Sequence, residues 1–319
     1  MGVALIMSLL LAPFLDPSGS GGHATELPQV GVVAHRGAGA GETFPDRPPE
    51  NTLPALLWGW EQGAPWVECD VILSGDGVPV VTHDFSSKRI SDKSINLDTS
   101  SLETIQKLDA GSWKGPQWSG LRIPTLSEAL EVVPEGCGLV IEIKSGEESA
   151  VPVIKAIEAS GVGLDRLMII SFNVDTLRAC RKACKEIALL WLMSFEQRTV
   201  EDGAAHWWVS WRSGGGRGKR VEQLLNLEQL IDRAVRDEFD GLDTTAKQPG
   251  ELAARMKAAG LLLGVWTVND PSAALALVRS GVQEITTDDP PKIIRALHEA
   301  GIEVACWPRR QNQPGGPAD

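Results

Sequence analysis

The sequence lacks a Cys-x-x-Cys pair, and its cysteines are odd in number, at positions 69, 137, 180, 184 and 306. Neither a zinc site nor a disulfide framework is therefore indicated. An excess of basic residues is also missing, because 42 Asp and Glu residues against 30 Lys and Arg residues give a formal net charge of −12. Proteins that bind nucleic-acid backbones usually present a basic face, so this balance argues against a nucleic-acid partner. A phosphate substrate stays compatible with it, because a bound divalent cation can supply local positive charge.

Long hydrophobic runs are absent apart from residues 3–15. That run is too short to span a bilayer core of ~30 Å as a helix, so no stable membrane span is expected. It has the length of a signal-peptide core, and small residues near Ala24 offer a cleavage point, although no Lys or Arg precedes it. These features favour export, to a periplasm or a medium, over a cytoplasmic location. The alternative is that residues 1–28 form a disordered or peripherally packed leader.

From residue 30 onward, short apolar runs alternate with stretches of helical pattern. The predicted strands are residues 30–35, 66–71, 139–143, 167–172, 187–193, 239–243, 261–268 and 284–287. The predicted helices are residues 52–62, 149–160, 174–185, 222–237, 250–259, 271–280 and 290–300. Eight strands separated by helices favour an α/β fold of the (β/α)₈ or TIM-barrel type over residues 29–303. A doubly wound open sheet is the alternative, but no Gly-x-Gly-x-x-Gly follows the first strand.

Three stretches depart from this alternation. Residues 85–126 are polar and contain several Gly and Pro residues, which predicts a loop excursion over one end of the barrel, ahead of the third strand. Residues 204–219 combine a tryptophan cluster (Trp207, Trp208 and Trp211) with a Gly-Gly-Gly run, and their pattern favours no particular element. Residues 304–319 are rich in Pro, Gly and Gln and are predicted to be a disordered tail.

A β-hairpin is predicted directly after the second strand. Asp76-Gly77 between two apolar runs is a strong signal for a two-residue turn. That turn would place Asp70 directly opposite His83, while Glu68, two residues before Asp70, shares its strand face. The hairpin is therefore expected to gather two carboxylates and an imidazole on one surface, with directly paired Cβ atoms about 5 Å apart.

Polar residues also end other apolar strands. Glu142 and Lys144 share a face at the carboxyl end of the third strand, where barrel active sites lie. Either they form an internal ion pair, or Glu142 is a further metal carboxylate and Lys144 holds a phosphate oxygen. His35 and Arg36 likewise follow the first strand. The segment 49–52, Pro-Glu-Asn-Thr, resembles a helix start in which Asn51 or Thr52 is the cap.

Together these residues predict a metal-assisted acid–base site. The carboxylates expected to converge are Glu68, Asp70 and Glu142, with Glu50 nearby. Ligation by oxygen alone suits Ca²⁺ or Mg²⁺ better than zinc. Two histidines beside a metal-bound phosphate are the groups that a general base and a general acid require. Arg36 and Lys144 would supply donors for non-bridging phosphate oxygens.

The ordered motifs resemble the glycerophosphodiester phosphodiesterase family, whose barrel is like that of phosphatidylinositol phospholipase C. The motifs are His-Arg-Gly, Pro-Glu-Asn-Thr, Glu-x-Asp, His-Asp and Glu-Ile-Lys, followed by matching pieces at 123–129, 171–173, 265–269 and 286–290. The resemblance covers residues 30–297. It implies a phosphodiesterase that releases an alcohol and glycerol 3-phosphate from deacylated phospholipids such as glycerophosphocholine. No obligate protein partner is inferred.

The resemblance also implies roles for individual residues. His35 and His83 correspond to the acid–base pair, and the metal ligands correspond to Glu68, Asp70 and Glu142. The residues that would hold phosphate, metal or histidine are Arg36, Glu50 and Lys144. Trp266 corresponds to an aromatic residue of the pocket wall, with simple barrel packing as an equal alternative.

The chain departs from the family pattern at residues 38–48, which separate two motifs that usually lie closer together. This longer loop is expected to reshape substrate access or to bring Glu42 or Asp46 near the metal. Two other functions stay open. A related barrel phosphodiesterase could act on lysophospholipids or sphingolipids through an apolar entrance built from Phe44 or the tryptophan cluster. A catalytically inactive barrel could bind a lipid or glycan.

Overall fold

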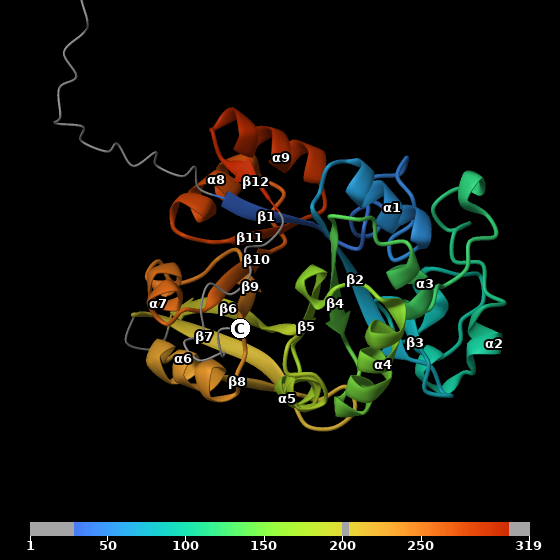
Figure 1. Cartoon of the computed structure of the whole chain (residues 1–319), viewed down its shortest axis with the longest axis horizontal. Coiled ribbons are helices and arrows are strands. Elements are labelled where there is room, and N and C mark those ends of the chain that lie inside the picture. Colours follow the sequence, from blue (N-terminus) through green and yellow to red (C-terminus); the bar gives the residue numbers. More distant parts are fainter. Residues whose placement is uncertain (1–28, 200–203, 306–319) are drawn as a thin grey trace, which may run out of the picture.

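The computed structural model describes residues 29–199 and 204–305. In this part of the chain, eight parallel strands close into a barrel (Figure 1). They are β1 (Gln29–Ala34), β2 (Trp66–Leu73), β4 (Gly138–Ile143), β5 (Leu167–Ser171), β6 (Ala188–Thr199), β9 (Gly241–Thr245), β10 (Leu262–Trp266) and β11 (Glu284–Thr287). Closure is complete because β1 pairs with β2 on one side and with β11 on the other. The predicted TIM barrel is confirmed, and the open sheet is excluded.

Helices surround this barrel (Figure 1). They are α1 (Leu53–Glu61), α3 (Leu126–Glu131), α4 (Ala150–Ser160), α5 (Val174–Ala183), α6 (Leu227–Arg236), α7 (Leu252–Ala258), α8 (Pro271–Arg279) and α9 (Pro290–Glu299). Polar side chains start several of them, as where Thr52 Oγ1 accepts the Ala55 N–H or where Thr125 and Glu128 form a capping box. In the described ranges, no helix combines the length and the apolar character that crossing a membrane requires.

Side-chain alternation along the strands separates two apolar layers. On β2, Val67, Cys69 and Val71 face outward and pack with the surrounding helices. Trp66 faces inward and fills the barrel together with Val140, Met168, Ile170, Leu190 and Leu192. Because successive side chains point to opposite faces, the even-numbered residues Glu68 and Asp70 also face the barrel interior. The carboxylates of the predicted site therefore lie inside the barrel and not under the helices.

The hairpin after β2 forms, but the predicted register is wrong by one residue. Strand β3 (Pro79–Val81) pairs antiparallel to β2 with Val71 opposite Val81. The Thr82 N–H then donates to the Asp70 carbonyl oxygen at 2.9 Å, so Thr82 and not His83 faces Asp70. The reason is the turn: Ser74 N–H bonds to the Val78 carbonyl, and Gly77 adopts φ 82°, which gives a three-residue loop with a left-handed glycine.

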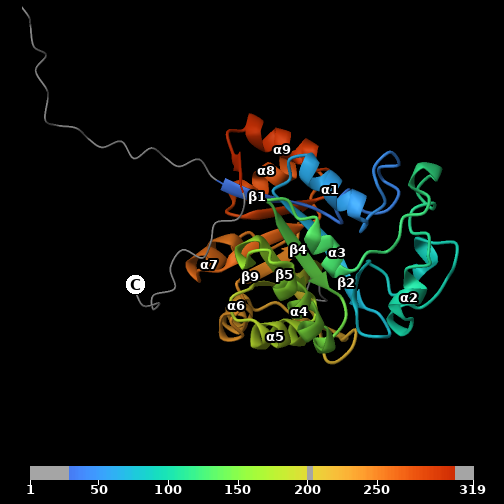
Figure 2. The same cartoon turned by 45° about the vertical axis from the view of Figure 1, so that its right-hand side comes forward.

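The predicted excursion between β2 and β4 contains short helices and an apolar cluster of its own. Its helical turns are η1 (Ser87–Arg89), η2 (Leu97–Thr99), α2 (Leu102–Ile105) and η3 (Pro116–Trp118). The buried residues of the cluster are Ile72, Val80, Ile90, Leu97, Ile105, Leu108, Ala110 and Ile123. The excursion extends to one side of the barrel beside β2 and β3 (Figure 2). Two of its cluster residues come from the hairpin, so hairpin and excursion form one packed unit.

A second addition to the barrel follows β6, which continues beyond the predicted end at Met193. Strands β7 (Ala205–Ser213) and β8 (Lys219–Leu224) pair with the end of β6 as an antiparallel sheet. Residues 204–219, whose sequence pattern favoured no particular element, lie mostly in this sheet. The helix predicted from 222 is therefore wrong at its start. Residues 222–224 pair with β7, and α6 begins only after Asn226, whose side chain accepts the Gln229 N–H.

Near the carboxyl terminus, β12 (Glu303–Val304) pairs with β1, so the first residue of the predicted tail lies in a strand. The rest of that tail beyond residue 305, and the leader at 1–28, fall outside the described residues. Export stays a prediction, which N-terminal sequencing of the mature protein would test.

Candidate active site

Three carboxylates converge inside the barrel as the sequence predicts. Glu68 and Asp70 lie on β2, and Glu142 lies on the adjacent strand β4, directly beside Asp70 in the parallel register. One oxygen from each of the three lies within 4.8 Å of the others. Parallel strands bring these residues together because their carboxyl ends meet at one mouth of the barrel. We call Glu68, Asp70 and Glu142 the acidic triad.

The electrostatics of the acidic triad favour a bound cation. Burial raises the pKa of Glu68, and the charges of Asp70 and Glu142 raise it further. Burial also opposes ionisation of Asp70, but the charges of Lys144 and Arg36 outweigh it and hold the pKa of Asp70 below its ordinary value. Glu68 Oε1 and Asp70 Oδ1 are buried and accept no hydrogen bond from the described residues. Asp70 Oδ1 has an ion-pair contact with Lys144 Nζ at 3.2 Å, and Glu68 Oε1 lacks a partner among the described residues. Three buried or partly buried carboxylates at this spacing fit a hard divalent cation.

Asn51 fixes one member of the triad, a role that capping alone did not suggest. Its Nδ2 donates to Asp70 Oδ2 at 2.8 Å, and its Oδ1 accepts the Asp70 backbone N–H at 3.0 Å. Thr52, not Asn51, caps α1. Asn51 has φ 58°, a left-handed conformation that asparagine adopts more readily than most residues. The preference of asparagine for this conformation can be recognised in the sequence, but its hydrogen bonds to Asp70, 19 residues away, cannot.

Arg36 contacts two members of the triad, and Glu50 contacts Arg36. The Arg36 backbone N–H donates to Glu68 Oε2 at 2.8 Å, and its guanidinium contacts Asp70 Oδ2 at 3.2 Å and Glu50 Oε1 at 2.9 Å. Glu50 also accepts from Arg89, at 2.8 and 3.0 Å, so its charge is used by two arginines. The triad itself does not include Glu50. Arg89 lies in the excursion, and no sequence motif pointed to it.

The two histidines are each held at one ring nitrogen by an aspartate. His35 Nδ1 lies 2.7 Å from Asp288 Oδ1, and His83 Nδ1 lies 2.7 Å from Asp84 Oδ1. This arrangement leaves Nε2 of each ring available for proton transfer. Burial lowers the pKa of His83 below its ordinary value, with Lys144 and Arg36 adding to that effect and Asp70 opposing it.

Asp288 is itself buried in a small network that holds His35. It accepts the Ala40 N–H at 3.0 Å and Asn269 Nδ2 at 2.7 Å. Burial alone would raise the pKa of Asp288, but the hydrogen bond and charge of His35, together with the bonds from Asn269 and Ala40, lower it to about 2, so Asp288 is ionised at neutral pH. Asn269 and Asp288 lie within motifs that the sequence marks, 265–269 and 286–290, but the contact of Asp288 with His35 was not predicted.

Lys144 bridges two members of the triad. Its Nζ lies 2.9 Å from Glu142 Oε1 and 3.2 Å from Asp70 Oδ1. The ion pair that was one alternative for Glu142 and Lys144 is therefore present, and Glu142 belongs to the triad as well. A phosphate beside the triad would meet this ammonium at the same point.

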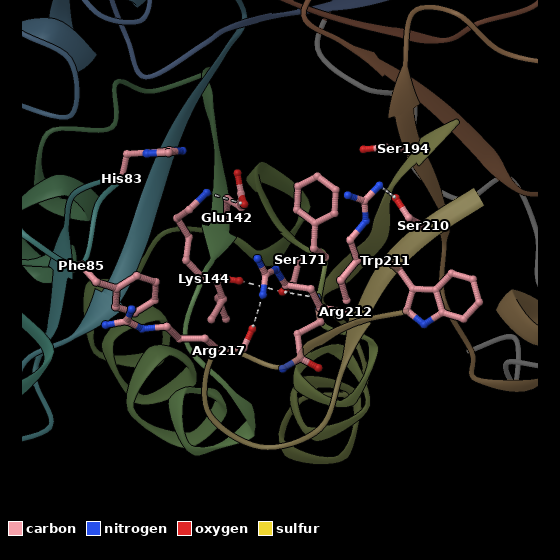
Figure 3. Close-up of a pocket in the computed structure, with 14 residues that line it drawn as sticks. His83, Phe85, Glu142, Lys144, Ser171, Ser194, Ser210, Trp211, Arg212 and Arg217 are labelled. Atoms are coloured by element: carbon pink, nitrogen blue, oxygen red, sulfur yellow. Dashed lines mark hydrogen bonds and ion pairs between the residues drawn. The ribbon is translucent and has the colours of Figure 1, made fainter. Parts of the chain in front are cut away.

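A cavity of about 510 Å³ opens beside these groups (Figure 3). His83, Glu142 and Lys144 line one end of it, and Phe172 forms part of its wall. Trp266 packs edge-on against Phe172, with ring centroids 5.6 Å apart, and so supports that wall from behind. In the insertion 38–48, Glu42 and Asp46 are exposed and take no part in the triad.

An enzyme that handles phosphate esters needs positive charge facing the phosphate and proton carriers beside it. This barrel can provide both, because the acidic triad fits a cation and both histidines lie near it. The charge of Asp70 acts on the His83 ring, and His35 directly precedes Arg36, whose backbone N–H donates to Glu68. The fold and the site thus have the features of a barrel hydrolase of phosphate esters. Comparison with known proteins narrows this class.

The model of the glycerophosphoryl diester phosphodiesterase family matches residues 35–292. A glycerophosphodiester phosphodiesterase of Caldanaerobacter subterraneus subsp. tengcongensis is 30% identical over 278 residues, which are 85% of this chain and 98% of the relative. The structure of an Oleispira antarctica phosphodiesterase, in complex with the product sn-glycerol-3-phosphate, aligns with a TM-score of 0.66 at 30% identity and covers 85% of this chain and 97% of that one.

A comparison at lower identity shows the same fold. The crystal structure of a glycerophosphodiester phosphodiesterase from Agrobacterium tumefaciens has a TM-score of 0.63 at 22% identity, covering 83% of this chain and 99% of that one. The match over residues 35–292 decides the family. The chain belongs to the glycerophosphoryl diester phosphodiesterase family, and with it to the phosphoric diester hydrolases, as the ordered motifs predict.

Proposed function

We propose that this protein hydrolyses glycerophosphodiesters to an alcohol and glycerol 3-phosphate with a divalent cation, Ca²⁺ or Mg²⁺, at the acidic triad. The observation that carries the proposal is the convergence of Glu68, Asp70 and Glu142 beside two aspartate-held histidines. The relative from Oleispira antarctica, crystallised with sn-glycerol-3-phosphate, supports the choice of product. When bound, the cation would supply positive charge that draws electrons from the phosphate.

The chain's own residues orient the phosphate and move protons. Lys144 would donate to a non-bridging oxygen as a point charge, and Arg36 would keep Glu68 and Asp70 in position through the contacts described above. One histidine takes a proton at Nε2 from the attacking hydroxyl, which belongs either to water or to the glycerol C2 position. The other histidine donates a proton to the leaving alcohol oxygen, so protons balance over the step. Attack by the C2 hydroxyl would give a cyclic phosphate that water opens in a second step.

Two of the side chains expected at an apolar entrance for lysophospholipids or sphingolipids, Phe44 and Trp211, are covered by neighbouring groups. Phe44 is covered by Arg47, whose guanidinium carbon lies 3.5 Å from the ring centroid. Trp211 is only 4% exposed and packs against Trp191 at 5.2 Å. Neither side chain is therefore free to receive an acyl chain. The reading as an inactive binding barrel has no support either, because the acids and both histidines are present and brought together.

The test is a substrate panel assayed with Ca²⁺, with Mg²⁺ and with a chelator. Glycerophosphocholine and glycerophosphoinositol are expected to release glycerol 3-phosphate only when a cation is present. Lysophosphatidylcholine, in the same assay, is expected to be cleaved far more slowly. Full activity in the chelator, or faster cleavage of lysophosphatidylcholine, would overturn the proposal.

A further inference from the structure

The cavity beside the triad continues to a group of arginines on the β7–β8 hairpin. Arg212, Arg217 and Arg220 line its hairpin end, where the guanidinium carbon of Arg217 lies 3.8 Å from the centroid of the Phe85 ring. Figure 3 labels Arg212 and Arg217. We propose that this end, the arginine end, binds an anionic group carried by the alcohol half of the substrate, such as a phosphate ester on an inositol head group. This inference rests on the proposed function, since it specifies which glycerophosphodiesters the site prefers.

The charges at the arginine end are only partly neutralised by protein carboxylates. Arg217 pairs with Asp98 at 2.6 Å, and Arg220 pairs with Glu222 at 3.0 Å. Arg212 instead uses Nη1 to donate to the carbonyl oxygens of Arg217 and Gly218, at 3.2 and 3.0 Å. No carboxylate in residues 29–199 and 204–305 forms an ion pair with Arg212, so its full charge is available to a ligand.

Arg212 is also held in place by the barrel. Its backbone N–H donates to the Phe172 carbonyl oxygen at 2.8 Å, directly after β5, and Asn173 forms a β-bridge with it. Both bonds to the hairpin turn come from Nη1, which leaves the edge formed by Nε and Nη2 for a bidentate contact. A preorganised arginine loses less freedom on binding an anion than a mobile lysine does.

Among the described residues that line the cavity, no acid pairs with Arg212. Glu142 is the acidic residue among those that line it, and its charge is engaged by Lys144 and the triad at the other end. A choline head group would therefore place a cation next to Arg212 with no carboxylate to receive it. A phosphate or carboxylate group would instead gain charge-assisted hydrogen bonds there.

A matched pair of substrates tests the inference. Glycerophosphoinositol and glycerophosphoinositol 4-phosphate differ only by one phosphate ester. The wild-type kcat/KM is expected to be roughly tenfold or more higher for the phosphorylated substrate, from the strength of charge-assisted hydrogen bonds. This preference should decline as salt is added, because screening weakens exposed charges.

The variant Arg212→Gln is expected to lower the ratio of the two kcat/KM values roughly tenfold, while Arg212→Lys lowers it less. Arg279→Gln is the matched control. It removes the same charge from an exposed position on α8, away from the cavity, and should leave the ratio unchanged. Equal losses on both substrates in Arg212→Gln would mean that the arginine serves the shared phosphate, which would overturn the inference.

Binding of the released alcohol separates this inference from the proposed function. Calorimetry should show that inositol 4-phosphate binds the wild type more tightly than inositol does, and that Arg212→Gln removes the difference. Equal binding of inositol 4-phosphate and inositol by the wild type would overturn the inference that the arginine end binds an anionic group, even if diesters are cleaved. Failure to cleave any diester would instead count against the proposed function, and the binding result would stand by itself.

Discussion

Asn51 and Asp70 are joined by two hydrogen bonds, one from the amide nitrogen to the carboxylate at 2.8 Å and one from the Asp70 backbone N–H to the amide oxygen at 3.0 Å. The variant Asn51→Ala removes both and loosens Asp70, which keeps its contacts with Arg36 and Lys144. We expect cation affinity and kcat to fall by about 10- to 100-fold, as for other groups that orient metal ligands. Calorimetric titration with Ca²⁺ and Mg²⁺ measures the first and steady-state kinetics the second. Asn226→Ala, which removes only the cap of α6, should change neither.

Replacing Glu68 by Gln should separate activity from stability. Glu68 is buried with a raised pKa, so the neutral amide removes a charge that the cation-free fold tolerates poorly. We expect activity to fall by at least 100-fold, while the Tm measured in chelator stays equal or rises. The Tm increase that Ca²⁺ or Mg²⁺ gives the wild type should disappear. Glu61→Gln, at an exposed position, is the control, and a Tm increase by cation in Glu68→Gln would contradict the assignment.

Both histidines should be required for turnover. His35→Asn and His83→Asn are each expected to lower kcat by roughly 10²-fold or more, the usual magnitude for a general acid or base. His298→Asn, on an exposed position of α9, serves as the matched control. Near-normal kcat in both site variants would contradict the acid–base assignment.

The pH profile should report His83 and assign its role. Its pKa lies below the ordinary value of 6.5 because burial opposes the charged ring, while the charge of Asp70 and the hydrogen bond from His83 Nδ1 to the Asp84 carboxylate oppose that shift. Asp84→Asn replaces the charged acceptor with a neutral amide oxygen, which should lower the pKa of His83 further, so the limb of the kcat/KM profile that His83 controls moves to lower pH. A shift of the acidic limb identifies His83 as the base, and a shift of the alkaline limb identifies it as the acid. Asp92→Asn, at an exposed position, is the control and should leave the profile unchanged. A shift of the limb to higher pH in Asp84→Asn would contradict the prediction.

A buried acid outside the acidic triad should give the fold an unusual pH dependence. Burial raises the pKa of Glu284, on β11, to about 8 from its ordinary value of 4.5. Between these values the folded state holds a proton that the unfolded state has lost, so the free energy of unfolding decreases as pH rises from about 5 to 8. Glu284→Gln should reduce this decrease, as measured by urea unfolding at both pH values in chelator. Glu158→Gln, exposed on α4, should retain the wild-type slope.

Much of the site follows from local rules that can be applied to the sequence. Alternation along a strand places Glu68 and Asp70 on one face, and parallel strands place Glu142 beside them. The closed barrel follows from the repeated strand and helix patterns. These rules depend on spacing within one element or on the order of elements, so the sequence alone determined the class of fold, the acidic triad and the family.

Other relationships were decided by the tertiary structure. The hairpin register depends on the left-handed conformation of Gly77, which the Asp-Gly signal does not distinguish from a two-residue turn. His35 meets Asp288 across 253 positions, and Arg212 reaches the cavity only because β7 docks on the end of β5. Such partners are chosen when the barrel closes and brings distant loops to one mouth. These contacts cannot be predicted from spacing along the chain, because they depend on three-dimensional distance and not on separation in sequence.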